Sequence, residues 1–329
     1  MAQTLLEVKD LKTQFMTREG VVKAVDGVSF ELEAGETLGI VGESGSGKSV
    51  TALSIMRLVP RPGRIVAGRV TFKDQDLTDL SESEMQEVRG ESIAMIFQDP
   101  MTSLNPVFRV GWQVAEPLMV HADKKRPNAL SEATAMLKKV GIPNPEQRAK
   151  DFPHQFSGGM RQRAMIAMGL TTMPSVLIAD EPTTALDVTI QAQILELLRQ
   201  VNREFGTATI LITHNLGVVA GMCKRVLVMY AGKIVESGPT ADVFAHPQHP
   251  YTWSLLKSIP RLDADRHEPL RPITGVPPDL LDVPPGCAFH PRCAFRVERC
   301  SRDVPHLARV GETQLAACWV TQGGTKLDA

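Results

Sequence analysis

Eight residues near the start of the chain form the pattern Gly-x-x-x-x-Gly-Lys-Ser, which is typical of a phosphate-binding loop. The pattern follows a short apolar stretch and opens a run with helical spacing. Glycines let successive backbone N–H groups turn towards phosphate oxygens, and the N-terminus of the helix adds partial positive charge. Lys48 is expected to bind the β- and γ-phosphates, and Ser49 to ligate Mg²⁺. The residues expected to bind the nucleotide here are Gly42, Glu43, Ser44, Gly45, Ser46, Gly47, Lys48 and Ser49.

Two acidic residues supply the second half of a nucleotide site. Asp180 and Glu181 follow the apolar run Val-Leu-Ile-Ala, which predicts a buried strand. Ligands of open α/β sheets bind at the carboxyl ends of strands. Asp180 is therefore expected to serve Mg²⁺, and Glu181 to polarise the attacking water. Alone, the pair fits a solvated strand end equally well; with the phosphate loop upstream, it indicates nucleotide hydrolysis.

Alternating strands and helices are expected to position these motifs. Apolar and polar residues alternate through the first forty residues, which predicts strands there. From about Leu104 to Gly169 the spacing turns helical, and further on a hairpin is expected around Gly232. Strands that alternate with helices imply a parallel α/β sheet. After about Gly238 proline becomes frequent and the periodicity fades.

We therefore expect an α/β fold with two domains. Residues 1–240 are predicted to form a nucleotide-binding domain, with a helical subdomain at about 104–169. Residues 241–329 are predicted to form a small, irregular, Cys-rich C-terminal domain.

A third motif resembles the signature of the ATP-binding cassette (ABC) family, usually written LSGGQ. In this chain the corresponding residues read Phe-Ser-Gly-Gly-Met, so the similarity lies in the Ser-Gly-Gly core. Small residues at a helix N-terminus can cap a phosphate, and Ser157 can equally act as an ordinary helix cap. The resemblance implies a P-loop NTPase (RecA-like) core with an N-terminal antiparallel β subdomain. It also implies that the motif closes over ATP held by a partner cassette, through Ser157, Gly158, Gly159 and Met160.

The resemblance extends over roughly residues 5 to 240 and implies further roles. Gln98 corresponds to the Q-loop glutamine, which senses Mg²⁺ and faces the membrane partner. His214 corresponds to the switch histidine on the γ-phosphate, which makes Glu181 and His214 the expected catalytic residues. Phe15 takes the place of the aromatic residue that stacks on adenine, although it fits a core position equally well.

The resemblance also implies which residues form the dimer interface and which bind Mg²⁺. The D-loop at the dimer interface corresponds to Ala185, Leu186 and Asp187. The Mg²⁺ ligands implied are Ser49, Gln98 and Asp180. Since no catalytic position is altered, an idle regulatory cassette is disfavoured.

The segment HPQHPYTWSLLKSIPRL at 246–262 is similar to the one that follows the cassette in oligopeptide and dipeptide importer ATPases. Within that group the chain most resembles the D-type ATPase of dipeptide permeases. This resemblance implies a peripheral protein on the cytoplasmic face of the bacterial inner membrane. The partners implied are a second ABC ATPase in a heterodimer, two transmembrane permeases and an extracytoplasmic peptide-binding protein. Import of a nickel chelate or a glutathione-like molecule stays open. A soluble ABC ATPase acting on ribosomes or DNA is disfavoured, because the chain has one cassette and no sustained heptads.

Four cysteines near the end of the chain suggest a metal site. Cys287, Cys293, Cys300 and Cys318 have the spacing C-x5-C-x6-C-x17-C, and thiolates suit zinc or an iron–sulfur cluster. The spacing does not choose between these metals. The resemblance favours a [4Fe–4S] cluster, with Zn²⁺ as the alternative and unligated or disulfide-bonded cysteines as a third possibility. Cys223 stands apart and is expected to be a small buried residue.

The composition limits the other classes of partner. Lys+Arg number 36 and Asp+Glu 37, so the net charge is −1 and offers no overall basic excess for nucleic acid. No apolar run approaches the ~20 residues that span a bilayer. The first residues show no basic segment followed by an apolar one, so we expect no signal peptide.

Overall fold

The computed structural model describes residues 3–99, 103–184, 186–258 and 273–327. Ala185, expected in the D-loop, lies outside the described residues. The chain divides into two compact units, each built from several segments. Unit 1 comprises Met1–Leu6, Leu32–Thr37 and Thr71–Ile212, and unit 2 comprises Glu7–Glu31, Leu38–Val70 and Thr213–Ala329.

Unit 1 contains three parallel strands that end in the acidic motif. β7 (Val176–Asp180) pairs with β6 (Ile93–Ile96) on one side and with β8 (Ala208–Ile212) on the other. Every residue of β7 and β8 is buried, which is the pattern of strands covered on both faces. These pairs confirm the predicted parallel strands and the buried strand before Glu181.

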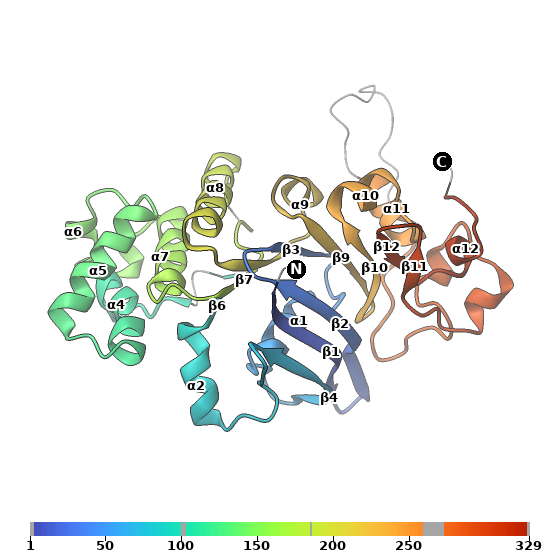
Figure 1. Cartoon of the computed structure of the whole chain (residues 1–329), viewed down its shortest axis with the longest axis horizontal. Helices are drawn as coiled ribbons and strands as arrows, with labels where there is room; N and C mark the ends of the chain where they lie inside the picture. The colour runs from blue at the N-terminus through green and yellow to red at the C-terminus, as the bar shows by residue number, and fades with distance from the viewer. Residues whose placement is uncertain (1–2, 100–102, 185, 259–272, 328–329) are drawn as a thin grey trace. The chain divides into compact units, whose positions relative to one another are not determined.

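The helices of unit 1 match the helical pattern predicted between Leu104 and Gly169. α4, α5 and α7 pack against one another, and Figure 1 shows them together with α6. The elements outside the strand trio are β5 (Gln75–Asp76), α2 (Glu82–Glu91), α4 (Val110–His121), α5 (Arg126–Lys139), α6 (Pro145–Arg148), η1 (Pro153–Gln155), α7 (Gly158–Leu170) and α8 (Val188–Phe205).

Unit 2 contains the phosphate loop between a strand and a helix. β3 (Thr37–Val41) pairs parallel with β9 (Arg225–Tyr230), and the loop leads from β3 into α1 (Lys48–Ile55). β9 and β10 (Lys233–Pro239) form the predicted antiparallel hairpin, with Gly232 in the turn at φ 76°. A second sheet places β1 (Thr4–Met16) between β2 (Val21–Glu33) and β4 (Gly63–Phe72).

The C-terminal region continues the sheet of unit 2. β12 (Gln314–Ala316) pairs antiparallel with β10 and with β11 (Ala308–Val310), and Figure 1 shows this pair beside β10. Strands of three residues are too short to show alternation, so the sequence did not predict them. The remaining elements are α9 (Leu216–Met222), α10 (Thr240–Ala245), α11 (Pro250–Lys257), η2 (His290–Arg292), η3 (Glu298–Ser301) and α12 (Trp319–Gln322).

The structure bears differently on the remaining expectations about the domain boundary, Cys223 and membrane spans. The boundary at residue 240 stays a prediction. Cys223 is buried as expected and lies just after α9. None of the described helices has both the length and the apolar character that crossing a membrane requires.

Candidate nucleotide site

The phosphate loop has a backbone that only glycine fits at two of its positions. A Cβ at Gly42 would lie 2.3 Å from the carbonyl oxygen of Met229, and one at Gly47 would lie 2.3 Å from that of Ala24. Both residues have positive φ, 153° and 101°, which side chains disfavour. Gly47 is also the N-cap of α1, so the loop turns directly into the helix N-terminus. This is the strand–loop–helix context that the sequence predicted for phosphate binding.

Lys48 lies on the inner side of this loop. Its Nζ donates to the carbonyl oxygens of Gly42, at 2.9 Å, and Glu43, at 2.8 Å, and the residue is only 5% exposed. Ser49 follows in the first turn of α1 and is half-buried. The carbonyl oxygens of the loop therefore hold the Lys48 ammonium group against the loop, where its positive charge favours binding of an anion.

Phe15 lies at the end of β1 and is half-buried. A Cβ at Gly63 would lie 2.6 Å from the Cε1 atom of Phe15, so a glycine at 63 leaves space for the ring.

Glu181 has a strained backbone and two side-chain partners. It adopts φ 46°, which is rare for a residue other than glycine and common at functional sites. Its Oε2 accepts hydrogen bonds from Gln98 Nε2, at 3.0 Å, and from Thr184 Oγ1, at 2.8 Å. The structure thus brings Gln98 and Glu181 together within unit 1, while Asp180 is buried at the end of β7. Thr184 was missed in the sequence; a hydroxyl three residues after the acidic pair was the available signal.

The signature motif forms the start of α7. The Oγ of Ser157 accepts from the Met160 N–H at 3.3 Å, which confirms Ser157 as the N-cap. Ser157 and Gly158 are exposed, and a Cβ at Gly159 would lie 2.9 Å from Ile190 Cγ2 in α8. The N-termini of α7 and α8 are therefore close, and two small exposed residues lead into α7.

The remaining predicted residues lie at turns that precede helices. Asp187 caps α8, because its Oδ1 accepts from the Ile190 N–H at 2.9 Å, and Leu186 comes just before it. His214 is exposed and follows β8 by two residues; the next residue, Asn215, caps α9.

Comparison with known proteins identifies the family. Residues 25–184 match the ABC transporter family model, and residues 235–300 match the model for the C-terminal region of oligopeptide/dipeptide transporters. The oligopeptide transport ATP-binding protein OppD of Salmonella typhimurium is 54% identical, over 97% of this chain and 94% of the relative. The dipeptide transport ATP-binding protein DppD of Bacillus subtilis is 53% identical, over 97% of this chain and 95% of the relative. The chain belongs to the ABC transporter ATP-binding family. It is an ATPase of the ABC type.

Solved ABC cassettes share the fold. The dimeric ATP-binding cassette MJ0796, in a post-hydrolysis state bound to ADP and Pi, is 26% identical with a TM-score of 0.65. The match covers 72% of this chain and 99% of the cassette. CbiO1 of Clostridium perfringens, part of the ABC transporter complex cbiONQ, is 29% identical with a TM-score of 0.62, over 74% of this chain and 91% of that protein.

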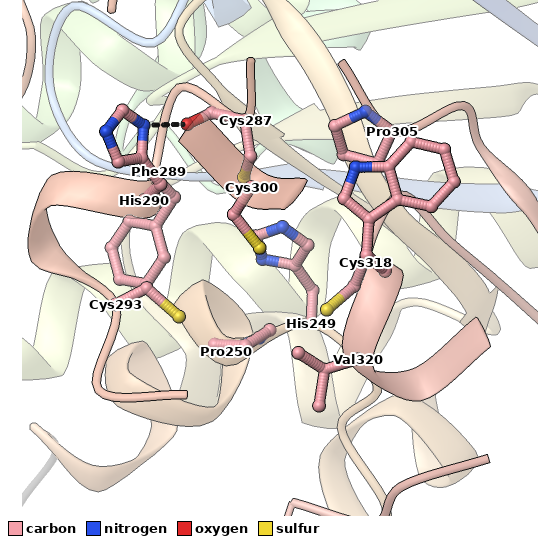
Figure 2. A pocket seen from close by; sticks show the side chains of 11 residues that line it. His249, Pro250, Cys287, Phe289, His290, Cys293, Cys300, Pro305, Cys318 and Val320 are labelled. Atoms are coloured by element: carbon pink, nitrogen blue, oxygen red, sulfur yellow. Dashed lines mark hydrogen bonds between the residues drawn. The ribbon is translucent and has the colours of Figure 1, made fainter. Parts of the chain in front are cut away.

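The four C-terminal cysteines do not form the predicted metal centre of this ABC protein. Cys287, Cys293, Cys300 and Cys318 line one small pocket together with His249 and Phe289, as Figure 2 shows. Yet within the described ranges no group of three or more His, Cys, Asp or Glu side chains is arranged to hold a metal ion.

The prediction of an iron–sulfur cluster is therefore wrong, and among the described residues the zinc alternative finds no ligand set either. Burial raises the pKa of Cys287 to about 11 and that of Cys293 to about 12. Residue type and spacing suggested ligation, but the structure holds these four cysteines as free thiols, Cys300 and Cys318 buried and Cys287 and Cys293 half-buried.

Two further residues near the ABC phosphate loop escaped sequence reasoning. Tyr251 and Arg292 both contact Glu43. They are 208 and 249 residues away along the chain, so no short-range pattern marks them.

Proposed function

We propose that this chain hydrolyses ATP to energise an importer of dipeptides or oligopeptides across the bacterial inner membrane. The observation that carries the proposal is the combination, in one chain, of a formed phosphate loop with a match to the oligopeptide/dipeptide transporter C-terminal region. Relatives more than half identical over nearly their whole length are named as oligopeptide or dipeptide transport ATP-binding proteins, which supports peptides as the cargo.

ATP, the substrate, is proposed to bind along the phosphate loop. Lys48 and the backbone N–H groups from Gly42 onwards bind its phosphates, and Phe15 stacks on the adenine. The loop supports this role, because Gly42 and Gly47 have positive φ where a Cβ would meet neighbouring backbone, and the Lys48 ammonium group donates to the loop carbonyls.

Mg²⁺ is proposed to bind through Ser49, Gln98 and Asp180, whose hydroxyl, amide and carboxylate oxygens suit a hard cation. When bound, Mg²⁺ neutralises charge on the β- and γ-phosphate oxygens. Glu181 is the general base: its carboxylate is oriented by Gln98 and Thr184, which donate to the same oxygen. His214 donates to the γ-phosphate and stabilises its developing charge.

The signature residues are proposed to act on a neighbouring cassette. Ser157 and Gly158 are exposed at the N-terminus of α7, a position that suits contact with phosphate on a second ABC ATPase. Gly159 and Met160 complete that surface, and Leu186 with Asp187 contributes to the dimer interface. The assembly we propose adds two transmembrane permeases and an extracytoplasmic peptide-binding protein, with this chain bound peripherally on the cytoplasmic face.

The test is uptake by the reconstituted complex. Proteoliposomes containing this chain and its co-purified membrane partners are supplied with labelled dipeptide, oligopeptide, nickel chelate and glutathione, with ATP on the side of this chain. We expect ATP-dependent accumulation of peptide, abolished by Glu181→Gln. Accumulation of the nickel chelate or glutathione alone would refute the peptide assignment. Co-purification with ribosomes and without permeases would refute the importer.

A further inference from the structure

The C-terminal region contacts the phosphate loop at an acidic residue, Glu43. Arg292 Nη1 donates to Glu43 Oε2 at 2.7 Å, and Nη2 donates to Oε1 at 3.1 Å, so the ion pair is bidentate. The side chains are 5% and 24% exposed, respectively. Bidentate arginine–carboxylate pairs are among the stronger and more directional polar contacts in proteins, and solvent screens this one little.

Tyr251 holds the backbone of the same residue. The Glu43 N–H donates to the Tyr251 hydroxyl at 2.7 Å, and Tyr251 is fully buried. Burial raises the pKa of Tyr251 above its ordinary value, so the hydroxyl stays neutral. The carbonyl of Glu43 accepts from Lys48 Nζ at 2.8 Å. The N–H, carboxylate and carbonyl of Glu43 therefore all have fixed partners, two of them from the C-terminal region.

A rigid surround orients Arg292. Its Nε donates to the Thr274 carbonyl at 2.9 Å and its Nη1 to the Tyr230 hydroxyl at 3.3 Å. The guanidinium also lies 5.8 Å from the ring centroid of Phe289, which packs edge-on to Tyr230 and Tyr251. Burial lowers the pKa of Arg292, but its hydrogen bonds to Glu43 and Tyr230 raise it by more, and the group stays charged. Contacts with residues distant in sequence thus orient the Arg292 guanidinium towards Glu43 of the phosphate loop.

These contacts answer two problems that the loop poses. Glycine-rich backbone is costly to order, and no atom of the described residues lies within 4 Å of a Cβ built on Gly45. In addition, the carboxylate of Glu43 belongs to a loop that binds phosphates, and like charges repel. Arg292 and Tyr251 restrict the backbone at Glu43, and Arg292 neutralises its charge.

We propose that Arg292 and Tyr251 are positioning residues for ATP: they preorganise the phosphate loop and cancel the charge of Glu43, so the C-terminal region sets the affinity for ATP. Arg292 is too buried to bind ATP itself and acts through Glu43. The inference rests on the proposed function, since it assumes that the loop binds ATP.

The test measures the Kd of the full chain for ATP with Mg²⁺ by calorimetry. We expect Arg292→Ala to raise the Kd by about tenfold or more, because preorganisation and charge compensation are both lost. Arg292→Lys keeps the positive charge but cannot form the bidentate pair, so its Kd should lie between those of Arg292→Ala and the wild type. Adding Glu43→Gln to Arg292→Ala should recover part of the affinity, because the uncompensated carboxylate is gone. In the assembled complex, Arg292→Ala should raise KM for ATP with kcat nearly unchanged.

The matched control is Arg302→Ala. Arg302 pairs with Glu298 in the same region, but the two side chains are 72% and 79% exposed, and we expect an unchanged Kd. Should Arg292→Ala lower the melting temperature enough to unfold the chain, Tyr251→Phe removes only the hydroxyl and should still weaken binding severalfold. Wild-type affinity in Arg292→Ala, or no recovery on adding Glu43→Gln, overturns the inference. Failure of the wild type to bind ATP refutes the proposed function instead.

Discussion

We expect the buried carboxyl group of Glu236 to make the stability of the protein depend on pH near neutrality. It lies in β10 and is fully buried, and its two carboxyl oxygens accept from the Gln248 N–H, at 2.6 Å, and the His249 N–H, at 2.9 Å. Burial raises the pKa of Glu236 to about 7, and this outweighs the hydrogen bonds that favour the charged form. The change we consider is Glu236→Gln, which removes the titration and keeps the shape.

The sign follows from which state holds the proton. The folded-state pKa of Glu236 is raised from 4.5 to about 7, so the folded state binds more protons between these values. The stabilising contribution of Glu236 is full below pH 4.5 and is lost as the pH rises through about 7. At about 1.4 kcal/mol per pKa unit, the free energy of unfolding falls by about 3 kcal/mol across this window.

His249 produces the opposite slope beside it. Burial lowers the pKa of His249 from 6.5 to about 3, so the unfolded state binds more protons between these values and stability rises with pH there. The two slopes oppose each other in the wild type from about pH 4.5 to 6.5. Glu236→Gln keeps the slopes of His249 and of every other group, so subtracting the variant from the wild type isolates Glu236.

The assay is urea unfolding of the wild type and Glu236→Gln at several pH values from about 4.5 to about 8. We expect the wild type minus variant difference in unfolding free energy to fall by about 3 kcal/mol over this range. Glu298→Gln, at a carboxylate that is 79% exposed, is the control and should give a difference that hardly changes. A difference for Glu236→Gln that is independent of pH would refute the argument from burial.

Two further changes test the nucleotide site. Glu181→Gln should lower ATP hydrolysis by the assembled complex about a hundredfold or more while ATP still binds, because the general base is lost; unchanged turnover would rule out that role. Gly42→Ala should abolish ATP binding measured by calorimetry, because its Cβ would lie 2.3 Å from the Met229 carbonyl. Gly206→Ala is the control, because Gly206 also has positive φ (67°) but no atom of the described residues lies within 4 Å of a Cβ built there. This variant should bind ATP as the wild type does, and equal ATP binding by both variants would contradict the steric argument.

Local signals explain what the sequence predicted. The phosphate loop, the apolar strand before Asp180 and the N-cap at Ser157 each depend on residues within one turn or strand, so spacing and residue type suffice to find them. The hairpin at Gly232 is found in the same way, since its turn requires positive φ.

Contacts between distant segments explain what the sequence did not predict. The bond from Gln98 to Glu181 links residues 83 apart, and the sequence named both residues without their contact. The cysteines show the opposite error: four thiols close in sequence suggested a metal, but the environment that decides between ligand and packed thiol comes from the fold. Short strands such as β11 and β12 gave no periodic signal either.

The identity of residue 43 links these observations. A carboxylate in a phosphate-binding loop opposes anion binding on electrostatic grounds, so a sequence read locally makes Glu43 look unfavourable. The bidentate ion pair with the buried Arg292 guanidinium offsets this repulsion, because Glu43 and Arg292 together carry almost no net charge. The same contact lets an acidic side chain anchor the loop, which a smaller neutral residue cannot do. Glu43 and Arg292 therefore depend on each other, and neither can be interpreted without the C-terminal region that brings them together.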